Sequence, residues 1–178
     1  MKNSKQWLLL TVLALIWLIA ACNEENDEAL TIMMFSSLPH DFHDQMMMEL
    51  EDIVNESGYH PNIKMFDASH EKLFIEMAAG DGDIYIVEES LADLMIDPVI
   101  LEPLDKLIDF KDVSEEEQPF FKRMNETTGE THIYALPFGE NVFPEITTDN
   151  YMIALMKERS DEAGGFQLVS QLYESNQE

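Results

Sequence analysis

Three short apolar runs lie in the first half of the chain, each ended by polar residues. Residues 30–35 are almost continuously apolar and are followed by two serines, which is typical of a strand covered on both faces. Residues 62–67 alternate more clearly, and residues 83–87 are again apolar after Asp83. The pattern predicts three strands at these positions.

Two amphipathic segments separate these runs. In residues 41–57 the apolar positions are Phe42, Met46, Leu50, Ile53 and Val54, the spacing of a helix with one buried face. Residues 69–79 predict a second helix, and Gly58 and Gly80 follow the two helices as stop signals. The alternation predicts an α/β fold with three layers, a mainly parallel sheet and right-handed crossovers.

The second half of the chain has weaker periodicity. Residues 91–95 predict a helical turn, and residues 114–124 begin with a Ser-Glu-Glu-Glu sequence that resembles a capping box. Residues 132–136 predict a further strand that ends at a proline. Residues 150–158 and 166–173 predict two more helices.

The first 21 residues have the layout of an export signal. A basic head with Lys2 and Lys5 precedes an apolar run from Trp7 to Ile19, and two alanines follow. The alternative is a transmembrane anchor, which needs about 20 apolar residues, more than this run provides. We therefore assign residues 1–21 to a signal peptide, 22–29 to an acidic tether and 30–178 to a single domain.

The end of this signal resembles the lipobox of bacterial lipoproteins in the sequence Ile19, Ala20, Ala21, Cys22. The resemblance implies that Cys22 becomes the first residue of the mature protein and carries a thioether-linked diacylglycerol. Two acyl chains, such as palmitate, would anchor the domain stably on the extracytoplasmic face of the cell membrane. The alternative is a buried structural cysteine.

Charge narrows the possible partners. The chain has 178 residues, and its 36 acidic and 10 basic side chains give a net charge of −26. Such a surface repels phosphates, so no nucleic acid is expected as a partner. A single cysteine can form neither an internal disulfide nor a cysteine-based zinc site.

Three motifs resemble the extracellular solute-binding proteins of ABC importers. They are the helix end and strand in residues 77–87, the Leu-Glu-Pro-Leu-Asp sequence of residues 101–105 and the His-Ile-Tyr-Ala-Leu-Pro sequence of residues 132–137. The resemblance implies the N-terminal lobe of a type II periplasmic-binding fold. Only 38 residues follow Glu140 here, so we expect a truncated relative in which a second lobe is incomplete.

Ligands of parallel sheets meet the carboxyl ends of the strands. This rule selects a set of candidate ligand-binding residues at three strand ends: Ser36, Ser37, Asp67, Ser69, Glu88 and Glu89. Their hydroxyls and carboxylates suit a small polar solute rich in hydroxyls or amines. The alternative is that Ser36, Ser69 and Ser90 only cap the turns and helices that follow them.

His40 and His43 are a weak metal candidate, because two imidazoles three residues apart at a helix start can face the same way. The sequence does not identify further ligands, and we expect no metal and no cofactor. The twelve methionines are better explained as core filling than as thioether ligands of copper. No nucleophile elbow is present, so we expect no enzyme.

Two hypotheses follow for the function. The first is a lipid-anchored extracytoplasmic binding module, with an ABC permease or a separate protein that supplies the second lobe as its partner. The alternative is a structural or interaction lipoprotein that uses the same lobe as a scaffold.

Lipidation is directly testable. We expect metabolic labelling with a fatty-acid analogue to mark the wild-type protein and to spare the Cys22→Ala variant, because the thioether requires the thiol. Gel fluorescence of membrane fractions measures the label. Equal labelling of both proteins would contradict lipidation at Cys22.

Overall fold

The structure is a computed structural model that describes residues 29–56, 58–108, 121–139, 143, 150–157 and 164–175. The signal peptide and Cys22 lie outside these residues, as does nearly all of the acidic tether. None of the helices in the described part of the chain has the length and apolar character needed to cross a bilayer.

The first half of the chain forms the predicted βαβαβ unit. Its elements are β1 (Thr31–Ser36), α2 (His40–Glu56), β2 (Asn62–Asp67), α3 (His70–Ala79) and β3 (Ile84–Glu88). These bounds agree with the sequence pattern to within one or two residues. The alternation of hydrophobic periods is therefore a sufficient guide to this half.

The sheet has five described strands in the order β2-β1-β3-β7-β6. Strand β1 pairs in parallel with both β2 and β3. Strand β7 (Tyr151–Leu155) is antiparallel to β3, and β6 (Leu136–Phe138) is antiparallel to β7. Four of the five strands thus share one direction, which confirms the mixed α/β class and the mainly parallel sheet.

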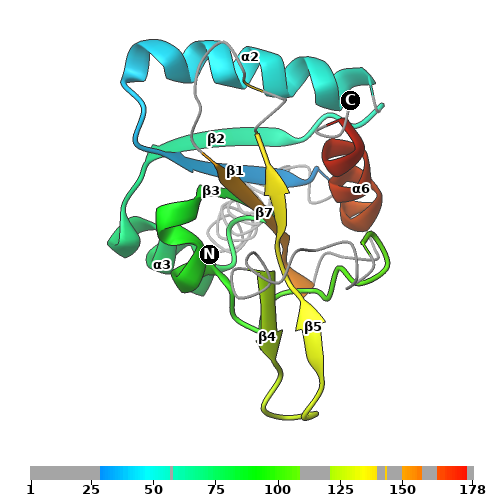
Figure 1. Cartoon of the computed structure of the whole chain (residues 1–178). Coiled ribbons are helices and arrows are strands. Elements are labelled where there is room, and N and C mark those ends of the chain that lie inside the picture. Colours follow the sequence, from blue (N-terminus) through cyan, green and yellow to red (C-terminus); the bar gives the residue numbers. More distant parts are fainter. Residues whose placement is uncertain are drawn as a thin grey trace, which may run out of the picture.

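The layers follow from the strand order. The chain steps from β1 to β2 in one direction and from β2 back past β1 to β3 in the other, so right-handed crossovers place α2 and α3 on opposite faces. Helix α2 contacts α6 (Gly165–Ser175), and α3 contacts α4 (Ala92–Met95), which follows the 3₁₀ turn η1 (Glu89–Leu91). Figure 1 shows α2 and α3 on either side of the sheet.

The two innermost parallel strands are apolar except at their end residues. In β1, Ile32, Met33, Met34 and Phe35 are fully buried, as are the four apolar residues of β3 that begin with Ile84. Burial on both faces is the reason that these strands read as continuous apolar runs and not as alternating ones.

The predicted apolar face of α2 packs on the core with one exception. Met46, Leu50 and Val54 of α2 are buried in the core, but Phe42 is 40% exposed. Phe42 lies in the first turn, close to where the chain enters the helix, and so reaches the rim of the core only. Helix α3 ends at Gly80, whose φ of 70° is left-handed and favours glycine.

Two predictions for the second half are wrong. Residues 150–158 were expected to be helical, but Tyr151–Leu155 is strand β7, fully inside the sheet. Residues 132–136 were expected to form one strand, but they divide between two sheets: β5 (Thr131–Ile133) pairs with β4 (Lys122–Met124), and β6 begins at Leu136. Pro137 is tolerated within β6 because β6 is the outermost of the described strands of the sheet.

Three other segments have mixed outcomes. The helical turn expected at residues 91–95 is confirmed by α4, and the helix expected at residues 166–173 is confirmed by α6. Most of the helix expected at residues 114–124 lies outside the described residues, and its last three residues are strand β4.

Candidate functional site

The strand ends that the sequence selects lie together at one edge of the sheet. Ser36 and Asp67 are direct neighbours in the pairing of β1 with β2. On the other side of β1, Phe35 pairs with Val87, so Glu88 follows next to Ser36. The expected convergence of Ser36, Asp67 and Glu88 at the carboxyl edge is thus present in the fold. Whether they bind a ligand is a separate matter.

Glu88 connects the ends of β1 and β3. Its Oε2 accepts the backbone N–H of Ser37 at 2.9 Å, and its Oε1 accepts the hydroxyl of Ser90 at 2.6 Å. Burial raises the pKa of the Glu88 carboxyl, but the hydrogen bonds from Ser90 and Ser37 outweigh burial and lower it below the ordinary value. Glu88 is therefore ionised at neutral pH and bound within the protein.

Ser36 is an interior residue. It is fully buried, its Oγ lies 2.7 Å from the hydroxyl of Tyr151 on β7, and it accepts the backbone N–H of Leu38 at 3.2 Å. This arrangement ties β7 to the end of β1 across β3. The expectation that Ser36 faces a ligand is wrong because its hydroxyl is used by the fold itself.

Ser69 and Glu89 have different roles at the same edge. Ser69 is the N-cap of α3, where its Oγ accepts the backbone N–H of Lys72 at 3.3 Å, so the capping alternative is confirmed for Ser69. Glu89 is exposed and accepts the side-chain amide of Asn150 at 3.1 Å. The side chains left open to solvent are therefore those of Ser37, Asp67 and Glu89.

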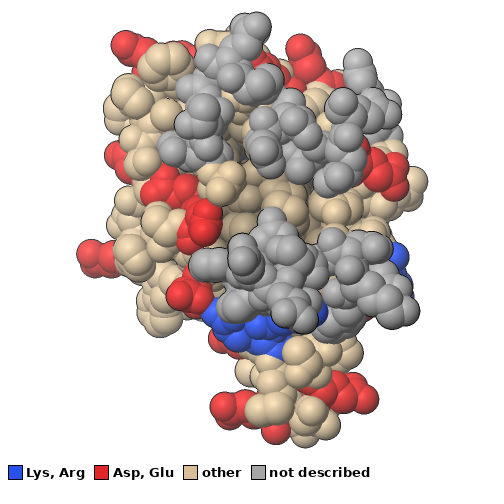
Figure 2. Space-filling model, viewed as in Figure 1, with Lys and Arg blue, Asp and Glu red and all other residues tan. Residues whose placement is uncertain are grey.

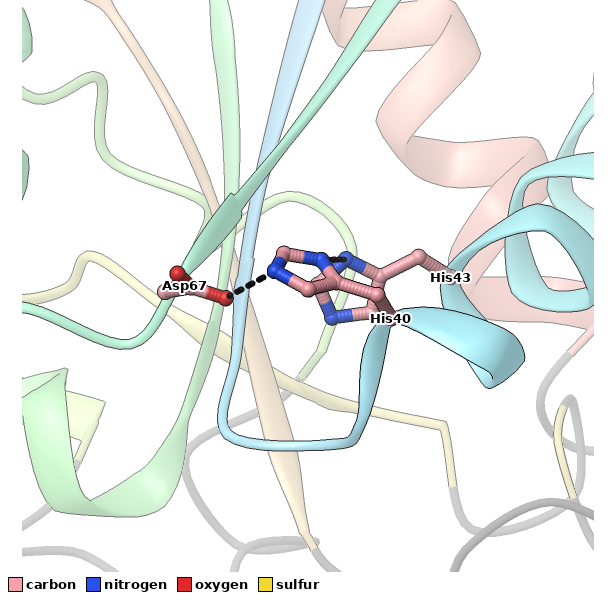
Figure 3. A group of neighbouring side chains, drawn as sticks. All are labelled: His40, His43 and Asp67. Carbon is pink, nitrogen blue, oxygen red and sulfur yellow. Dashed lines mark hydrogen bonds and ion pairs between the residues drawn. The ribbon is translucent and has the colours of Figure 1, made fainter.

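A second group of side chains adjoins Asp67 (Figure 3). His40 and His43 come from the first turn of α2, and Asp67 comes from the end of β2. The His40 Nε2 lies 3.8 Å from the Asp67 Oδ1, and the Nδ1 atoms of the two histidines lie 3.4 Å apart. The histidines also line an open hollow of about 430 Å³ together with Asp41, Asp44, Met47 and Met65.

Two of these residues were not identified as site residues from the sequence, and a third was identified for a different role. Tyr151 and Asn150 were missed because their segment was predicted to be helical. Asp67 was identified as a solute ligand but not as a neighbour of His40, since nothing in the sequence distinguishes it from 35 other acidic residues. The strand order supplies this information, because α2 follows β1 and β1 lies beside β2.

The surface around the site is acidic. Figure 2 shows Asp and Glu side chains distributed over the visible face, whereas the visible Lys and Arg side chains lie near the base of the β4–β5 hairpin and at the right edge of the view. A cationic or neutral polar ligand is favoured by this surface over an anionic one.

Comparison with known proteins gives two likenesses. The chain is 26% identical over 174 residues to the protein named "Putative lipoprotein YteS" from Bacillus subtilis (strain 168), covering 93% of this chain and 95% of that protein. The structure of the present chain is similar to the crystal structure of the arginine-bound form of domain 1 from TmArgBP, with 12% sequence identity and a TM-score of 0.33. The match covers 81% of this chain and 92% of that one. This second likeness is too low to carry an argument about fold or ligand. No family model matches the chain.

The lowered pKa of Glu88 predicts a pH-dependent contribution to stability. A carboxyl whose folded pKa lies below its ordinary value of 4.5 stabilises the fold fully above that value, and the contribution is lost as the pH falls through the folded pKa. We expect Glu88→Gln to lower the free energy of unfolding by about 1 kcal/mol at neutral pH, after allowance for solvent screening. The difference from the wild type should shrink as the pH falls below 4.5 and through the folded pKa.

Urea unfolding of both proteins at a series of pH values measures this difference. The exposed Glu51 on α2 provides the matched control, and Glu51→Gln should change stability little at any pH. A constant difference between Glu88→Gln and the wild type across the whole range would contradict the assignment.

Proposed function

We propose that this chain is a lipoprotein of the extracytoplasmic face of the cell membrane that binds a small polar solute weakly at the carboxyl edge of its sheet. The lipobox-like residues 19–22 support the lipid anchor. The likeness to YteS along nearly the whole of both chains supports it further, since that protein is named a lipoprotein. The proposed activity is binding without catalysis.

One observation carries the binding proposal: two carboxylates, Asp67 and Glu89, are exposed at the edge where three parallel strands end. Carboxylates accept hydrogen bonds from hydroxyls and attract amines, and they repel phosphates. An amino sugar, an amino acid or a polyol therefore fits this edge better than a phosphorylated solute.

The open geometry limits the affinity. The Asp67 side chain is 73% exposed, so a solute bound there keeps much of its hydration. The cost of ordering the solute is not reduced in proportion. We therefore place the dissociation constant in the high micromolar range, about −5 kcal/mol of binding free energy. A permease or a second protein that covers the solute from the other side would raise this affinity.

A second candidate is a scaffold lipoprotein without a solute. It is favoured by the internal use of Ser36, Ser69, Ser90 and Glu88, whose polar atoms bond to the protein itself. In this case the edge serves the fold, and the partner is another protein.

Calorimetry distinguishes the two candidates. The full chain in detergent, with a chelator present, is titrated with a library of sugars, amino acids and short peptides. We expect binding in the high micromolar range that is lost in Asp67→Ala. The exposed Asp52 on α2 is the matched control, and Asp52→Ala should bind as the wild type does.

The other outcomes are equally informative. No heat with any solute at millimolar concentration would favour the scaffold. A nanomolar affinity would contradict the argument from the open edge.

A further inference from the structure

The cluster of His40, His43 and Asp67 has a feature that solute binding does not use: one nitrogen of the His40 ring faces a nitrogen of His43, and its other nitrogen faces the carboxylate of Asp67. The tight connection from β1 to α2 brings His40 and His43 over the end of β2, and Figure 3 shows the His40 ring between His43 and Asp67. His43 is only 9% exposed, whereas the side chains of His40 and Asp67 are 79% and 73% exposed. The cluster thus has one fixed member and two that can adjust.

A backbone carbonyl selects the tautomer of the neutral His43 ring. Its Nε2 lies 2.8 Å from the carbonyl oxygen of Leu38, and a carbonyl only accepts, so Nε2 donates. In the neutral ring the lone pair is then on Nδ1, the atom that faces His40. A hydrogen bond from one ring nitrogen to a backbone carbonyl, with the other nitrogen free, is the usual arrangement of a metal-binding histidine.

The spacing of the nitrogens matches two ligands of one ion. Nitrogens bound at 2.0–2.1 Å in a tetrahedral site are about 3.3–3.4 Å apart. The Nδ1 atoms of His40 and His43 are 3.4 Å apart. In the absence of an ion, the same distance suits a hydrogen bond from the His40 ring to His43.

Asp67 provides the third ligand. One ligand atom from each of the three residues can be chosen so that all lie within 4.8 Å of one another. His40 directs its Nδ1 to His43 and its Nε2 to Asp67, so binding of one ion by all three residues requires the exposed His40 and Asp67 side chains to rotate until one His40 nitrogen faces both partners. The hollow beside the cluster leaves room for a water molecule as the fourth ligand.

The charge around the cluster favours a cation. The N-terminus of α2 carries about half a positive charge, which opposes a cation. Three carboxylates outweigh this partial charge, because each carries a full negative charge. They are Asp67 and the two residues that line the hollow, Asp41 and Asp44.

We propose that His40, His43 and Asp67 bind a divalent transition-metal ion, with Zn²⁺ as the best match. Two imidazoles and one carboxylate form a ligand set that prefers zinc and its neighbours to Mg²⁺ or Ca²⁺, which require mostly oxygen ligands. This goes beyond the proposed solute binding and does not depend on it, although Asp67 takes part in both.

The test is a titration of the full chain in detergent, stripped of metals, with Zn²⁺ in a molar excess of Mg²⁺ and without any solute. The Mg²⁺ occupies exposed carboxylates and leaves imidazole sites free. We expect one ion per chain in the wild type. His40→Ala should weaken binding by about tenfold or more, and Asp67→Asn should weaken it as well.

Two controls match these variants outside the cluster. His60 lies beyond the far end of α2, where its ring contacts Asn55, and Asp52 is exposed on the same helix. His60→Ala and Asp52→Asn should bind Zn²⁺ as the wild type does. Because His40 is exposed, His40→Ala keeps the fold even if a change at the buried His43 does not.

A second readout locates the ion. In NMR spectra of the imidazole nitrogens, Zn²⁺ should shift the Nδ1 signal of His43 and leave both nitrogens of His60 in place. Equal Zn²⁺ affinity in His40→Ala and His60→Ala, or loss of binding in excess Mg²⁺, would overturn the metal site. Neither result would bear on the solute titration, in which the chelator removes metals.

Discussion

The fixed register of β1 against β3 is the constraint on which the site depends. Both strands are apolar on both faces, so an alternation of buried and exposed side chains cannot set their register. Two carboxylates, one at each end of β3, set the register instead. The Asp83 Oδ2 accepts the backbone N–H of Thr31 at 2.7 Å, and the Glu88 Oε2 accepts that of Ser37 at 2.9 Å. Each bond joins the backbone of one strand to a side chain at the end of the other.

This constraint also explains how the carboxyl edge divides its polar groups. The groups nearest β1, Ser36 and Glu88, are used to hold β1, β3 and β7 together. The polar groups at the end of the neighbouring strand β2 are open to solvent. Asp67 is therefore available to His40 and to a solute. The carboxyl edge thus has two adjacent parts. The polar groups at the ends of β1 and β3 stabilise the sheet, and those at the end of β2 face the solvent.

The sequence predicts the first half of this fold well because short apolar runs alternate with longer segments whose hydrophobic period is about 3.6. It fails at Tyr151–Leu155, where a run of five apolar residues fits a buried strand and a buried helical segment equally well. The segment becomes a strand because it pairs with the edge of β3, which lies about sixty residues earlier in the sequence. No local pattern in the sequence encodes that pairing.

The candidate site was predictable only in part. The rule for strand ends located Asp67 and Glu88 correctly at one edge, but it could not tell that Ser36 is buried against Tyr151 or that Ser69 caps α3. The spacing of His40 and His43 indicated paired imidazoles. Their carboxylate neighbour became identifiable only from the strand order, which places the end of β2 beside the start of α2.

Nuclear Overhauser contacts between the backbones of β1 and β3 test the register most directly. The account predicts contacts that pair Ile32 with Ile84, Met33 with Tyr85 and Met34 with Ile86 in the isotopically labelled full chain. Contacts displaced by one or two residues, such as Met34 beside Tyr85, would contradict it, because Glu88 could then no longer accept the N–H of Ser37.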